Sequence, residues 1–396
     1  MPKVSLFSNY LNHYQLPFSL KMKELTNNNF YFVSQKAISV KRISLGFRNL
    51  SDENDFVVKT YEGQDELDKA YKLSLDSDYA IFGGNSKIDN FVFDRIKNDK
   101  LTFEYSERLN KRKPNLYLWI KKYLNMFVNR GIYSKNKLYL LCTGFYVASD
   151  FNEFNMYKGK AYKWGYFPKF VEHNIDELLN CKKNDKVNLI WAGRLIDWKH
   201  PDLVIELAKE LKKCNYNFNI DVVGNGEMED ELKKLIINDN LEDCVHMLGS
   251  MPPEEVRKQM EKSNIYLFTS DYQEGWGVVL NEAMNSGCAC VASHAAGSTG
   301  YLINHGENGL IYESENFDDL FNNVKKLIED DKYRERLGEN AYNTIKNEWN
   351  ADVAAERFLV LAKNLEEGRD TPFDSGICSK ANAISNGNAY SYMVKK

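Results

Sequence analysis

The fold of this chain is indicated most clearly by Asn264-Ile-Tyr-Leu-Phe-Thr269 and, four residues later, Glu274-Gly-Trp-Gly-Val-Val-Leu-Asn-Glu282-Ala-Met-Asn-Ser-Gly287. The first stretch is apolar and predicts a buried strand, and the second passes through glycines into a helical pattern over 278–286. A strand, a glycine-bearing turn and a helix start form an anion site in many α/β proteins, because backbone N–H groups and the helix dipole point at the ligand. Glu274 would lie in the turn, and Glu282, about two helical turns further on, could face the same ligand. Carboxylates beside a phosphate site usually bind hydroxyl groups, so the pattern indicates a ligand of the nucleotide-sugar kind.

Strands and helices alternate regularly around this stretch. The strands expected in this region are 187–192, 220–223, 245–248, 265–268 and 288–292. Helices that begin near Pro201, Met228 and Glu254 lie between them. The alternation predicts right-handed βαβ units and one parallel sheet, whose ligands bind beyond the carboxyl ends of the strands.

Loops that follow these strands carry further candidates. Arg194 and Lys199 lie in Gly193-Arg-Leu-Ile-Asp-Trp-Lys199, directly after a strand, and both could reach a pyrophosphate. The plain alternative is a pair of surface basic residues. Gly224-Asn225-Gly226 is a weaker candidate, since a tight turn also explains the glycines. Gly297-Ser-Thr-Gly300 follows the last strand and could present backbone amides to an anion.

The first half of the chain also predicts an α/β unit. Strands are expected at 4–7, 31–33, 79–82 and 137–142, around a helix that contains Leu16, Leu20 and Leu25. Asp76-Ser-Asp78 matches an Asp-x-Asp pair that could bind a divalent cation through oxygen ligands. It precedes a strand, at the edge opposite to the ligand edge, and is interpreted as a turn. No metal site is expected.

Length and composition fit a globular protein of two or three domains, with 396 residues of which 43% are hydrophobic. No apolar run approaches the roughly 20 residues of a membrane span, and the N-terminus lacks the pattern of a signal peptide. The seven cysteines form no CxxC pair and are expected to be reduced, which indicates a cytoplasmic protein. The nearest pair, Cys288-Ala-Cys290, is interpreted as core packing in a strand.

The basic residues are concentrated in the first half. Residues 1–180 carry 27 Lys and Arg against 20 Asp and Glu, whereas residues 181–396 carry 25 against 36. Residues 100–137 hold ten basic and two acidic side chains around an amphipathic stretch over 116–130. One interpretation is peripheral contact with the anionic inner face of a membrane, or with a phosphate-bearing acceptor. The other is an ordinary core helix with a solvated basic face.

Residues 187–366 resemble the nucleotide-sugar-binding half of a GT-B glycosyltransferase of the retaining family 4, also called glycosyltransferase group 1. The resemblance rests on Ala192-Gly-Arg-Leu, Lys199, Val222-Val-Gly-Asn-Gly226, Leu248-Gly249, Glu274-Gly-Trp-Gly277 with Glu282, and Gly306-Glu-Asn-Gly-Leu-Ile-Tyr312. In the first half, Tyr162-Lys-Trp-Gly-Tyr-Phe-Pro168 resembles the interdomain segment of the family's bacterial polysaccharide-assembly members.

The resemblance implies an α/β protein with two doubly wound, Rossmann-like domains that face each other across a cleft. Residues 1–175 would bind the acceptor and residues 186–346 the nucleotide sugar. A helix over 347–366 would cross back to the first domain, and 367–396 would be a flexible tail or a short accessory segment.

The resemblance also implies roles for single residues. Arg194 and Lys199 would neutralise the diphosphate leaving group in place of a metal ion, so that the donor, a UDP- or GDP-sugar, would need no cofactor. Glu274 would hold the transferred sugar and Glu282 the ribose. The other donor-binding residues would be Gly193, Asn225, Gly226, Gly275, Trp276 and Gly277.

The loop after the first strand departs from the family pattern. Asn9-Tyr-Leu-Asn-His-Tyr-Gln15 lacks the glycine pair that family members often have there. His13 is therefore considered as a site residue that replaces backbone contacts, since imidazole transfers protons near neutral pH. The alternative is a structural histidine.

Three functions remain open at this point. The first is retaining, metal-independent sugar transfer to a saccharide, lipid-linked or protein-linked acceptor in surface-polysaccharide or glycoconjugate biosynthesis, without nucleic acid as a partner. The second is a sugar-nucleotide epimerase of the same fold. The third is a non-catalytic subunit that binds a sugar nucleotide.

Overall fold

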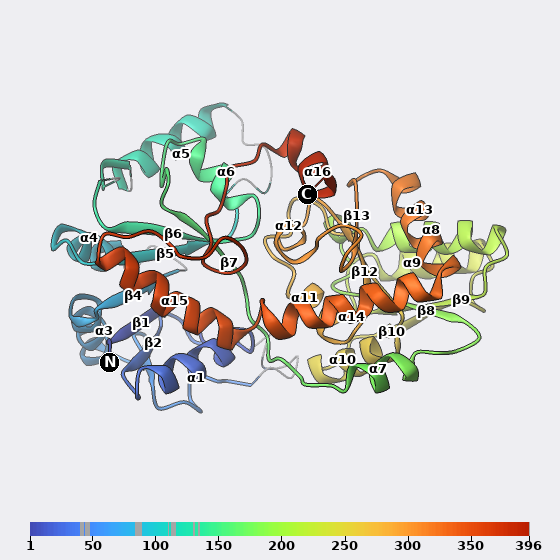
Figure 1. The fold of residues 1–396 in the computed structure, drawn as a ribbon, viewed down its shortest axis with the longest axis horizontal. Helices are drawn as coiled ribbons and strands as arrows, with labels where there is room; N and C mark the ends of the chain where they lie inside the picture. The colour runs from blue at the N-terminus through green and yellow to red at the C-terminus, as the bar shows by residue number, and fades with distance from the viewer. Residues whose placement is uncertain are drawn as a thin grey trace. The chain divides into compact units, whose positions relative to one another are not determined.

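The computed structural model describes the chain except residues 40–42, 44–47, 84–88, 110, 112–115, 130, 134 and 396. The chain forms two compact units (Figure 1). Unit 1 consists of Met1–Lys169 and Trp349–Ile384, and unit 2 consists of Phe170–Glu348 and Ser385–Lys396. The backbone therefore passes from one unit to the other at 169–170, 348–349 and 384–385.

Unit 1 is built on a seven-stranded sheet in the order β3-β2-β1-β4-β5-β6-β7. All neighbouring strands are parallel. The order reverses between β1 and β4, as in a doubly wound fold. The strands are β1 Val4–Ser8, β2 Phe30–Ser34, β3 Val57–Lys59, β4 Tyr79–Phe82, β5 Thr102–Ser106, β6 Leu138–Thr143 and β7 Ala161–Trp164.

Helices cover both faces of this sheet. One face buries Phe82 and Leu140 beneath α3 (Gln64–Asp76), α4 (Asp89–Lys97) and α6 (Val147–Asn152). On the other face, α1 (Leu16–Leu25) packs against α15 (Ala351–Glu366), as Figure 1 shows. There the ring centroid of Phe358 lies 5.0 Å from that of Phe103.

A buried arginine explains the turn between α3 and β4. The guanidinium of Arg95 donates to the carbonyl oxygens of Ser74 at 2.8 Å and Ser77 at 2.7 Å, and so satisfies the end of α3. In the same turn, the Asp78 carboxylate accepts a hydrogen bond from the Lys3 backbone N–H at 2.7 Å. Asp76 is the last residue of α3, and Ser77 and Asp78 form the turn that enters β4, which agrees with the interpretation of this stretch as a turn before a strand.

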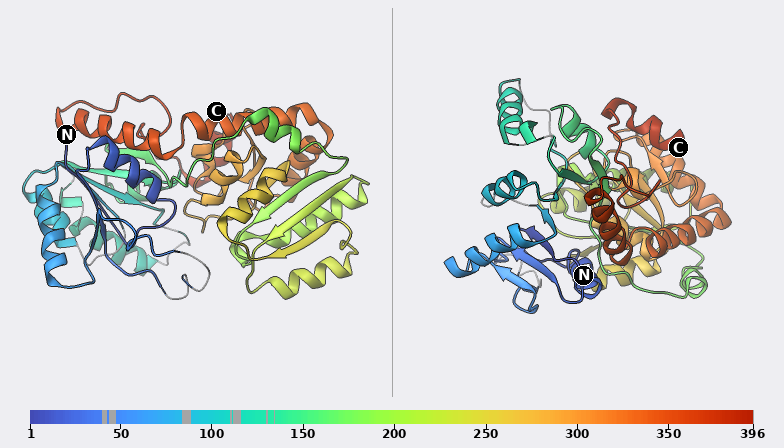
Figure 2. Two further views of the ribbon diagram at one scale, coloured as in Figure 1. Left: turned by 90° about the horizontal axis from the view of Figure 1, so that it is seen from below. Right: turned by 60° about the vertical axis from the view of Figure 1, so that its left-hand side comes forward.

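Unit 2 contains a six-stranded parallel sheet in the order β10-β9-β8-β11-β12-β13. Here the order reverses between β8 and β11. Figure 2 shows these strands side by side with helices on both faces. The strands are β8 Val187–Ala192, β9 Phe218–Val223, β10 Val245–Gly249, β11 Ile265–Phe268, β12 Ala289–Ser293 and β13 Leu310–Tyr312.

The helices of unit 2 form two packed groups. One contains α8 (Pro201–Lys213), α9 (Glu229–Asn238) and α13 (Phe317–Glu329), and buries Leu189 and Trp191 of β8. The other group comprises α7 Ile175–Cys181, α10 Pro253–Lys262, α11 Val278–Asn285 and α14 Asp331–Asn347. Side-chain caps explain where α13 and α14 begin, since Asn316 and Asp330 each accept a backbone N–H three residues on.

The end of the chain differs from the expected flexible tail. Residues 378–381 run antiparallel to β7, with hydrogen bonds such as Cys378 N–H to the Lys163 carbonyl at 2.9 Å. Ile377 and Cys378 are fully buried. Residues 386–395 then form α16, whose Tyr390 hydroxyl donates to Asp319 of α13 at 2.7 Å. The polar composition of this segment suggested disorder, but the burial of a few apolar side chains holds it against the rest of the structure.

The expected strands are confirmed to within one or two residues, and the α/β class is confirmed. The sequence analysis did not predict β3, β5, β7 or β13. All seven cysteines are free thiols, and Cys288 and Cys290 are buried at the start of β12, which confirms core packing. Within the described part of the chain, none of the helices combines the length and apolarity needed to cross a bilayer.

Candidate functional site

The candidate site of unit 2 lies where its strand order reverses. The carboxyl ends of β8 and β11 are neighbours there, and the loops 193–199 and 269–277 begin at these ends. A crevice at such a point is the usual ligand site of a doubly wound sheet. Most of the sequence-predicted donor residues lie in these two loops or in the loop 224–226 after β9.

Backbone hydrogen bonds join the loops into one surface. The Leu195 N–H donates to the Asn225 carbonyl at 2.9 Å, which fixes loop 193–199 on loop 224–226. The Asp271 N–H donates to the Trp198 carbonyl at 3.0 Å, and the Gly297 N–H to the Glu274 carbonyl at 3.1 Å. The structure therefore brings together loops that are separated by up to about a hundred residues in the sequence.

Two glycines permit this close approach. A Cβ on Gly224 would lie 1.8 Å from the Gly193 carbonyl oxygen, and the residue has φ of 142°. A Cβ on Gly277 would lie 2.2 Å from the ring of Phe268, and its φ is 87°. Gly277 is also the N-cap of α11. Both positions require glycine on steric and conformational grounds.

Lys199 and Glu274 form an ion pair through Nζ and Oε2, with only 11% and 13% of their side chains exposed. The Ser270 hydroxyl donates to the same carboxylate oxygen at 3.2 Å. The Thr269 hydroxyl donates to the Lys199 carbonyl at 2.5 Å and holds the backbone of the lysine. The two residues expected to bind diphosphate and sugar thus share one desolvated position, where charges act strongly.

Arg194 lies at the exposed rim of this pair. Its guanidinium carbon is 5.6 Å from the ring centroid of Trp198, and the Lys199 ammonium is 4.9 Å from the same centroid. Trp198 therefore lies under two cations, which a ring face attracts. Asn225 and Gly226 are exposed beside this rim.

Glu282 is a buried carboxyl group on α11, with 8% of the residue exposed. Burial raises its pKa to about 7, against the opposing charge of Arg257. The nearest guanidinium nitrogen of Arg257 is 3.8 Å from Glu282 Oε1.

Gly275 and Trp276 are buried, which differs from an open amide platform. The indole N–H of Trp276 donates to Asn281 Oδ1 at 2.8 Å, and its carbonyl accepts from the Ser298 N–H at 3.1 Å. Trp276 thus anchors the start of α11. In the first turn of α11, the Leu280 N–H donates to the carbonyl of the N-cap Gly277 at 3.0 Å, and anion binding by the other N–H groups of this turn stays a prediction.

Unit 1 carries the remaining candidates. His13 lies in the loop after β1, partly exposed, with its ring centroid 5.0 Å from that of Tyr14. At the same carboxyl edge, the Tyr105 hydroxyl lies 2.6 Å from Ser8 Oγ, and Tyr166 donates to Glu107 at 2.9 Å. The role of His13 stays a prediction.

The sequence analysis missed several residues that contact the predicted ones. Trp198 and Ser270 lie within or beside the loops that were singled out, so their position after a strand was an available signal. Arg257 lies on α10 and approaches Glu282 only in the folded chain, and no local pattern marks it.

Residues 176–344 match the family model of glycosyl transferases group 1. They form a group 1 glycosyltransferase domain. The recognition made from the sequence motifs is therefore confirmed at the level of the family. The match covers α7 to α14, that is, nearly all of unit 2 and the whole of the candidate site.

Curated relatives align with less than the whole chain. An uncharacterised glycosyltransferase of Methanocaldococcus jannaschii is 32% identical over 194 residues, 48% of this chain and 48% of that protein. The poly(ribitol-phosphate) alpha-N-acetylglucosaminyltransferase of Staphylococcus aureus is 27% identical over 194 residues, 48% of this chain and 39% of that protein. The chain thus spans less than half the length of these relatives.

Solved structures match both units. HepE of Anabaena, in complex with UDP, matches 92% of this chain and 100% of its own with a TM-score of 0.68 and 15% identity. This likeness shows the fold. The chain has the GT-B fold with two Rossmann-like units, as expected, and the cleft between them stays a prediction.

Proposed function

We propose that this chain transfers a sugar from a nucleotide-diphosphate sugar to an acceptor, with retention of the anomeric configuration and without a metal ion. The observation that carries the proposal is the desolvated Lys199–Glu274 pair at the strand-order reversal of unit 2. The group 1 domain supports transfer as the reaction class. The name of the Staphylococcus aureus relative, a poly(ribitol-phosphate) alpha-N-acetylglucosaminyltransferase, supports a role in polysaccharide or glycoconjugate assembly.

The chemistry needs a positive environment for the leaving group. As the bond between the anomeric carbon and the phosphate oxygen breaks, negative charge grows on the diphosphate. Lys199, Arg194 at the rim and the first-turn N–H groups of α11 supply the compensating charge and hydrogen bonds. This cationic set performs the neutralisation that a divalent ion performs in other transferases, which supports metal independence.

The two carboxylates are assigned to hydroxyl groups on different parts of the donor. Glu274 is oriented by Lys199 and Ser270 beside the leaving-group site, so we assign it to the transferred sugar. Glu282 is on the second turn of α11 and is assigned to the ribose. Retention requires no protein nucleophile when the acceptor attacks from the face of the departing phosphate. The proposed nucleotide is UDP or GDP.

The acceptor side is proposed to work at a membrane surface. α5 (Leu116–Asn129) turns Trp119 and Tyr123 inward against Phe154, with ring centroids at 5.8 and 6.0 Å. Other described positions of the helix expose large apolar side chains, and the exposed Lys121 lies among them. The apolar side chains are Tyr117, Ile120, Leu124 and Val128.

The basic surroundings of this face favour an anionic lipid surface. Lys121 is exposed on the same helix, and Lys111, Lys135 and Lys137 are exposed or partly exposed nearby in the sequence. Arg112 and Lys113 of the basic segment 100–137 lie outside the described residues. We propose peripheral contact with the inner face of a membrane, where lipid-linked acceptors are held.

The reaction is tested by incubating the full chain with UDP-, GDP-, ADP- and dTDP-sugars and a mixture of saccharide and lipid-linked acceptors. Transfer predicts a glycosylated product with the donor's anomeric configuration, and an equal rate in EDTA. Conversion of the donor to an epimer would instead support the epimerase, and binding without any turnover would support a non-catalytic subunit.

A further inference from the structure

The segment 170–174 is where the chain enters unit 2 from unit 1. We call it the linker. The Asn285 side chain, on α11, makes two hydrogen bonds to one linker residue. Its Nδ2 donates to the Val171 carbonyl at 2.8 Å, and its Oδ1 accepts from the Val171 N–H at 2.9 Å. A single side-chain amide thus satisfies both backbone polar groups of Val171.

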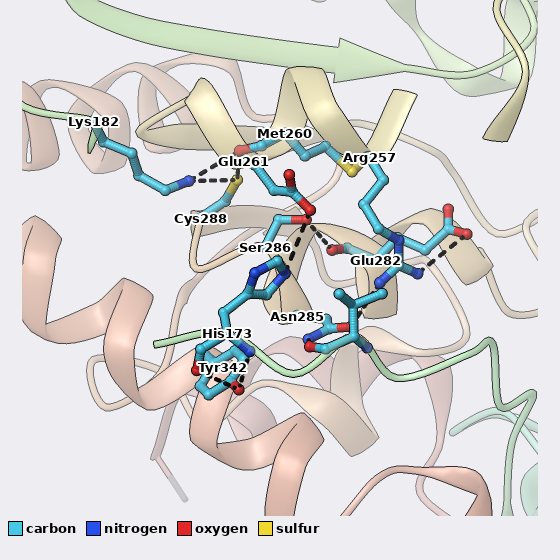
Figure 3. Close-up of polar contacts among 11 residues, drawn as sticks. His173, Lys182, Arg257, Met260, Glu261, Glu282, Asn285, Ser286, Cys288 and Tyr342 are labelled. Carbon is cyan, nitrogen blue, oxygen red and sulfur yellow. Dashed lines mark hydrogen bonds and ion pairs between the residues drawn. The ribbon is translucent and has the colours of Figure 1, made fainter. Parts of the chain in front are cut away.

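A second clamp lies two residues further along the linker. The Tyr342 hydroxyl, on α14, accepts from the His173 N–H at 2.9 Å and donates to the His173 carbonyl at 3.1 Å. The His173 ring is 3.4 Å from Glu261 of α10. Figure 3 shows His173 and Tyr342 beside each other, with Asn285 to their right.

Arg257 connects the first clamp to the candidate site. Its Nη1 donates to Asn285 Oδ1 at 2.6 Å, the same oxygen that accepts from Val171. Its Nη2 lies 3.8 Å from Glu282 Oε1, and 12% of the arginine side chain is exposed. Glu282 and Asn285 are three residues apart on α11 and therefore lie on one side of the helix. Figure 3 shows Arg257 between them.

We propose that Arg257 and Asn285 are positioning residues that link occupation of Glu282 by the nucleotide to the order of the linker. The inference rests on the proposed donor site. Ligand hydroxyls that donate to Glu282 favour its ionised form and hold it in one orientation. The ionised carboxylate then fixes Arg257, and Arg257 fixes the amide plane of Asn285 on Val171.

The link is reciprocal because it is a coupling free energy between two places in one molecule. Nucleotide binding orders the linker, and a well-clamped linker strengthens nucleotide binding by the same factor. The Tyr342 clamp holds the same linker without contact to Glu282. It therefore provides a matched control for a purely structural effect.

The test is amide hydrogen exchange of residues 170–174 in the full chain, with and without saturating UDP, or whichever of GDP, ADP and dTDP binds in a titration. In the wild type, the nucleotide should slow exchange at Val171 by at least about fivefold, the lower end of typical couplings. In Arg257→Met and Asn285→Asp, the slowing should fall below about twofold at saturation. Arg336→Met, on the exposed side of α14, should behave as the wild type.

Tyr342→Phe distinguishes a loss of the link to the nucleotide from a general loosening of the linker. This variant should exchange faster without ligand yet keep the fivefold slowing. Equal slowing in Arg257→Met and the wild type would overturn the link, as would bound nucleotide that leaves Val171 exchange unchanged. Absence of binding by all four nucleotides would overturn the proposed donor site itself, and the link with it.

Discussion

Lys199 and Glu274 are the residues on which the proposed chemistry depends most. Replacing Lys199 by Met or Glu274 by Gln should each lower sugar transfer by about 10² or more, because each removes a charge that acts in a desolvated position. Initial rates with a donor and an acceptor that support transfer by the wild type measure this. Wild-type transfer by either variant would contradict the roles assigned to the pair.

The double variant Lys199→Met/Glu274→Gln separates folding from function. Removing one partner of a buried pair leaves an uncompensated charge, whereas removing both leaves none. We therefore expect the double variant to melt closer to the wild type than either single variant does, although it stays inactive. Recovery of activity in the double variant would indicate that the pair is only structural.

Glu282 predicts a pH dependence of stability. Its pKa is raised from 4.5 to about 7 by burial, so between these values the folded state binds more protons than the unfolded state. Stability contributed by this group is therefore lost as the pH rises from about 4.5 to 7. The full effect is about 3.5 kcal/mol at most, since one pKa unit corresponds to about 1.4 kcal/mol.

Glu282→Gln removes this titration. The melting temperature of the variant minus that of the wild type should rise between pH 5 and pH 8, and the exposed α10 variant Glu255→Gln should show no such trend. Nucleotide affinity of the wild type should weaken as the pH falls below 7, because a neutral carboxyl is the weaker acceptor. A difference that stays constant or falls as the pH rises would show that the folded state ionises Glu282 at no cost and would contradict this prediction.

Among single residues, the sequence indicates those site candidates that directly follow a strand, but not the contacts between them. Lys199 and Glu274 were predictable because the carboxyl ends of parallel strands share one edge. Their direct pairing was not, since it depends on the distance between loops 193–199 and 269–277. Arg257 was not predictable, because its partners lie on another helix.

Among the elements, the glycine loops of unit 2 have the most specific steric requirement. Gly224→Ala would place a Cβ 1.8 Å from the Gly193 carbonyl and should separate the loops after β8 and β9. We expect a strong loss of nucleotide affinity and a lower melting temperature. Gly249→Ala is the matched control, because it also has positive φ, of 72°, but has open space around it.

The control should cost only the left-handed strain of an alanine, about 1–2 kcal/mol, and should keep nucleotide affinity. Melting temperature and calorimetric titration of both variants compare the two effects. Equal affinity in both variants would mean that the contact between the two loops does not shape the site.

The exposed face of α5 predicts binding to anionic lipid. The full chain should sediment with vesicles that contain phosphatidylglycerol and not with phosphatidylcholine alone, and added salt should weaken binding. Ile120→Asn with Leu124→Asn should abolish sedimentation. Ile237→Asn on α9 removes an equally exposed apolar side chain, 61% exposed, and should have no effect. Lipid binding that survives the α5 changes would exclude this face.

The sequence analysis missed strands that are too short or too polar to show an apolar pattern. β3 and β13 have three residues each, too few to show a period, and β13 lies among glycines and turn residues. β5 is Thr-Phe-Glu-Tyr-Ser, whose polar members mask its burial. Long apolar strands such as β8 were located to the residue, because burial on both faces needs a continuous apolar run.

At the scale of the whole molecule, the fold class was predictable and the path of the last residues was not. Regular strand–helix alternation is sufficient to indicate a doubly wound sheet. The segment after α15 crosses from unit 1 to unit 2 at 384–385, guided by the isolated side chains Ile377, Cys378 and Met393. Single apolar residues in polar surroundings carry no periodic signal, so the composition suggested a tail.

The central claim is that unit 2 holds a nucleotide diphosphate on Lys199. Calorimetric titration of the full chain in EDTA with UDP, GDP, ADP and dTDP tests it most directly, with Lys199→Met and the exposed-lysine control Lys258→Met alongside. One nucleotide should bind with 1:1 stoichiometry, and Lys199→Met should weaken it by at least about tenfold, or 1.4 kcal/mol, while Lys258→Met leaves it unchanged. Equal affinity of Lys199→Met and the wild type, or no binding by any of the four nucleotides, would contradict the account.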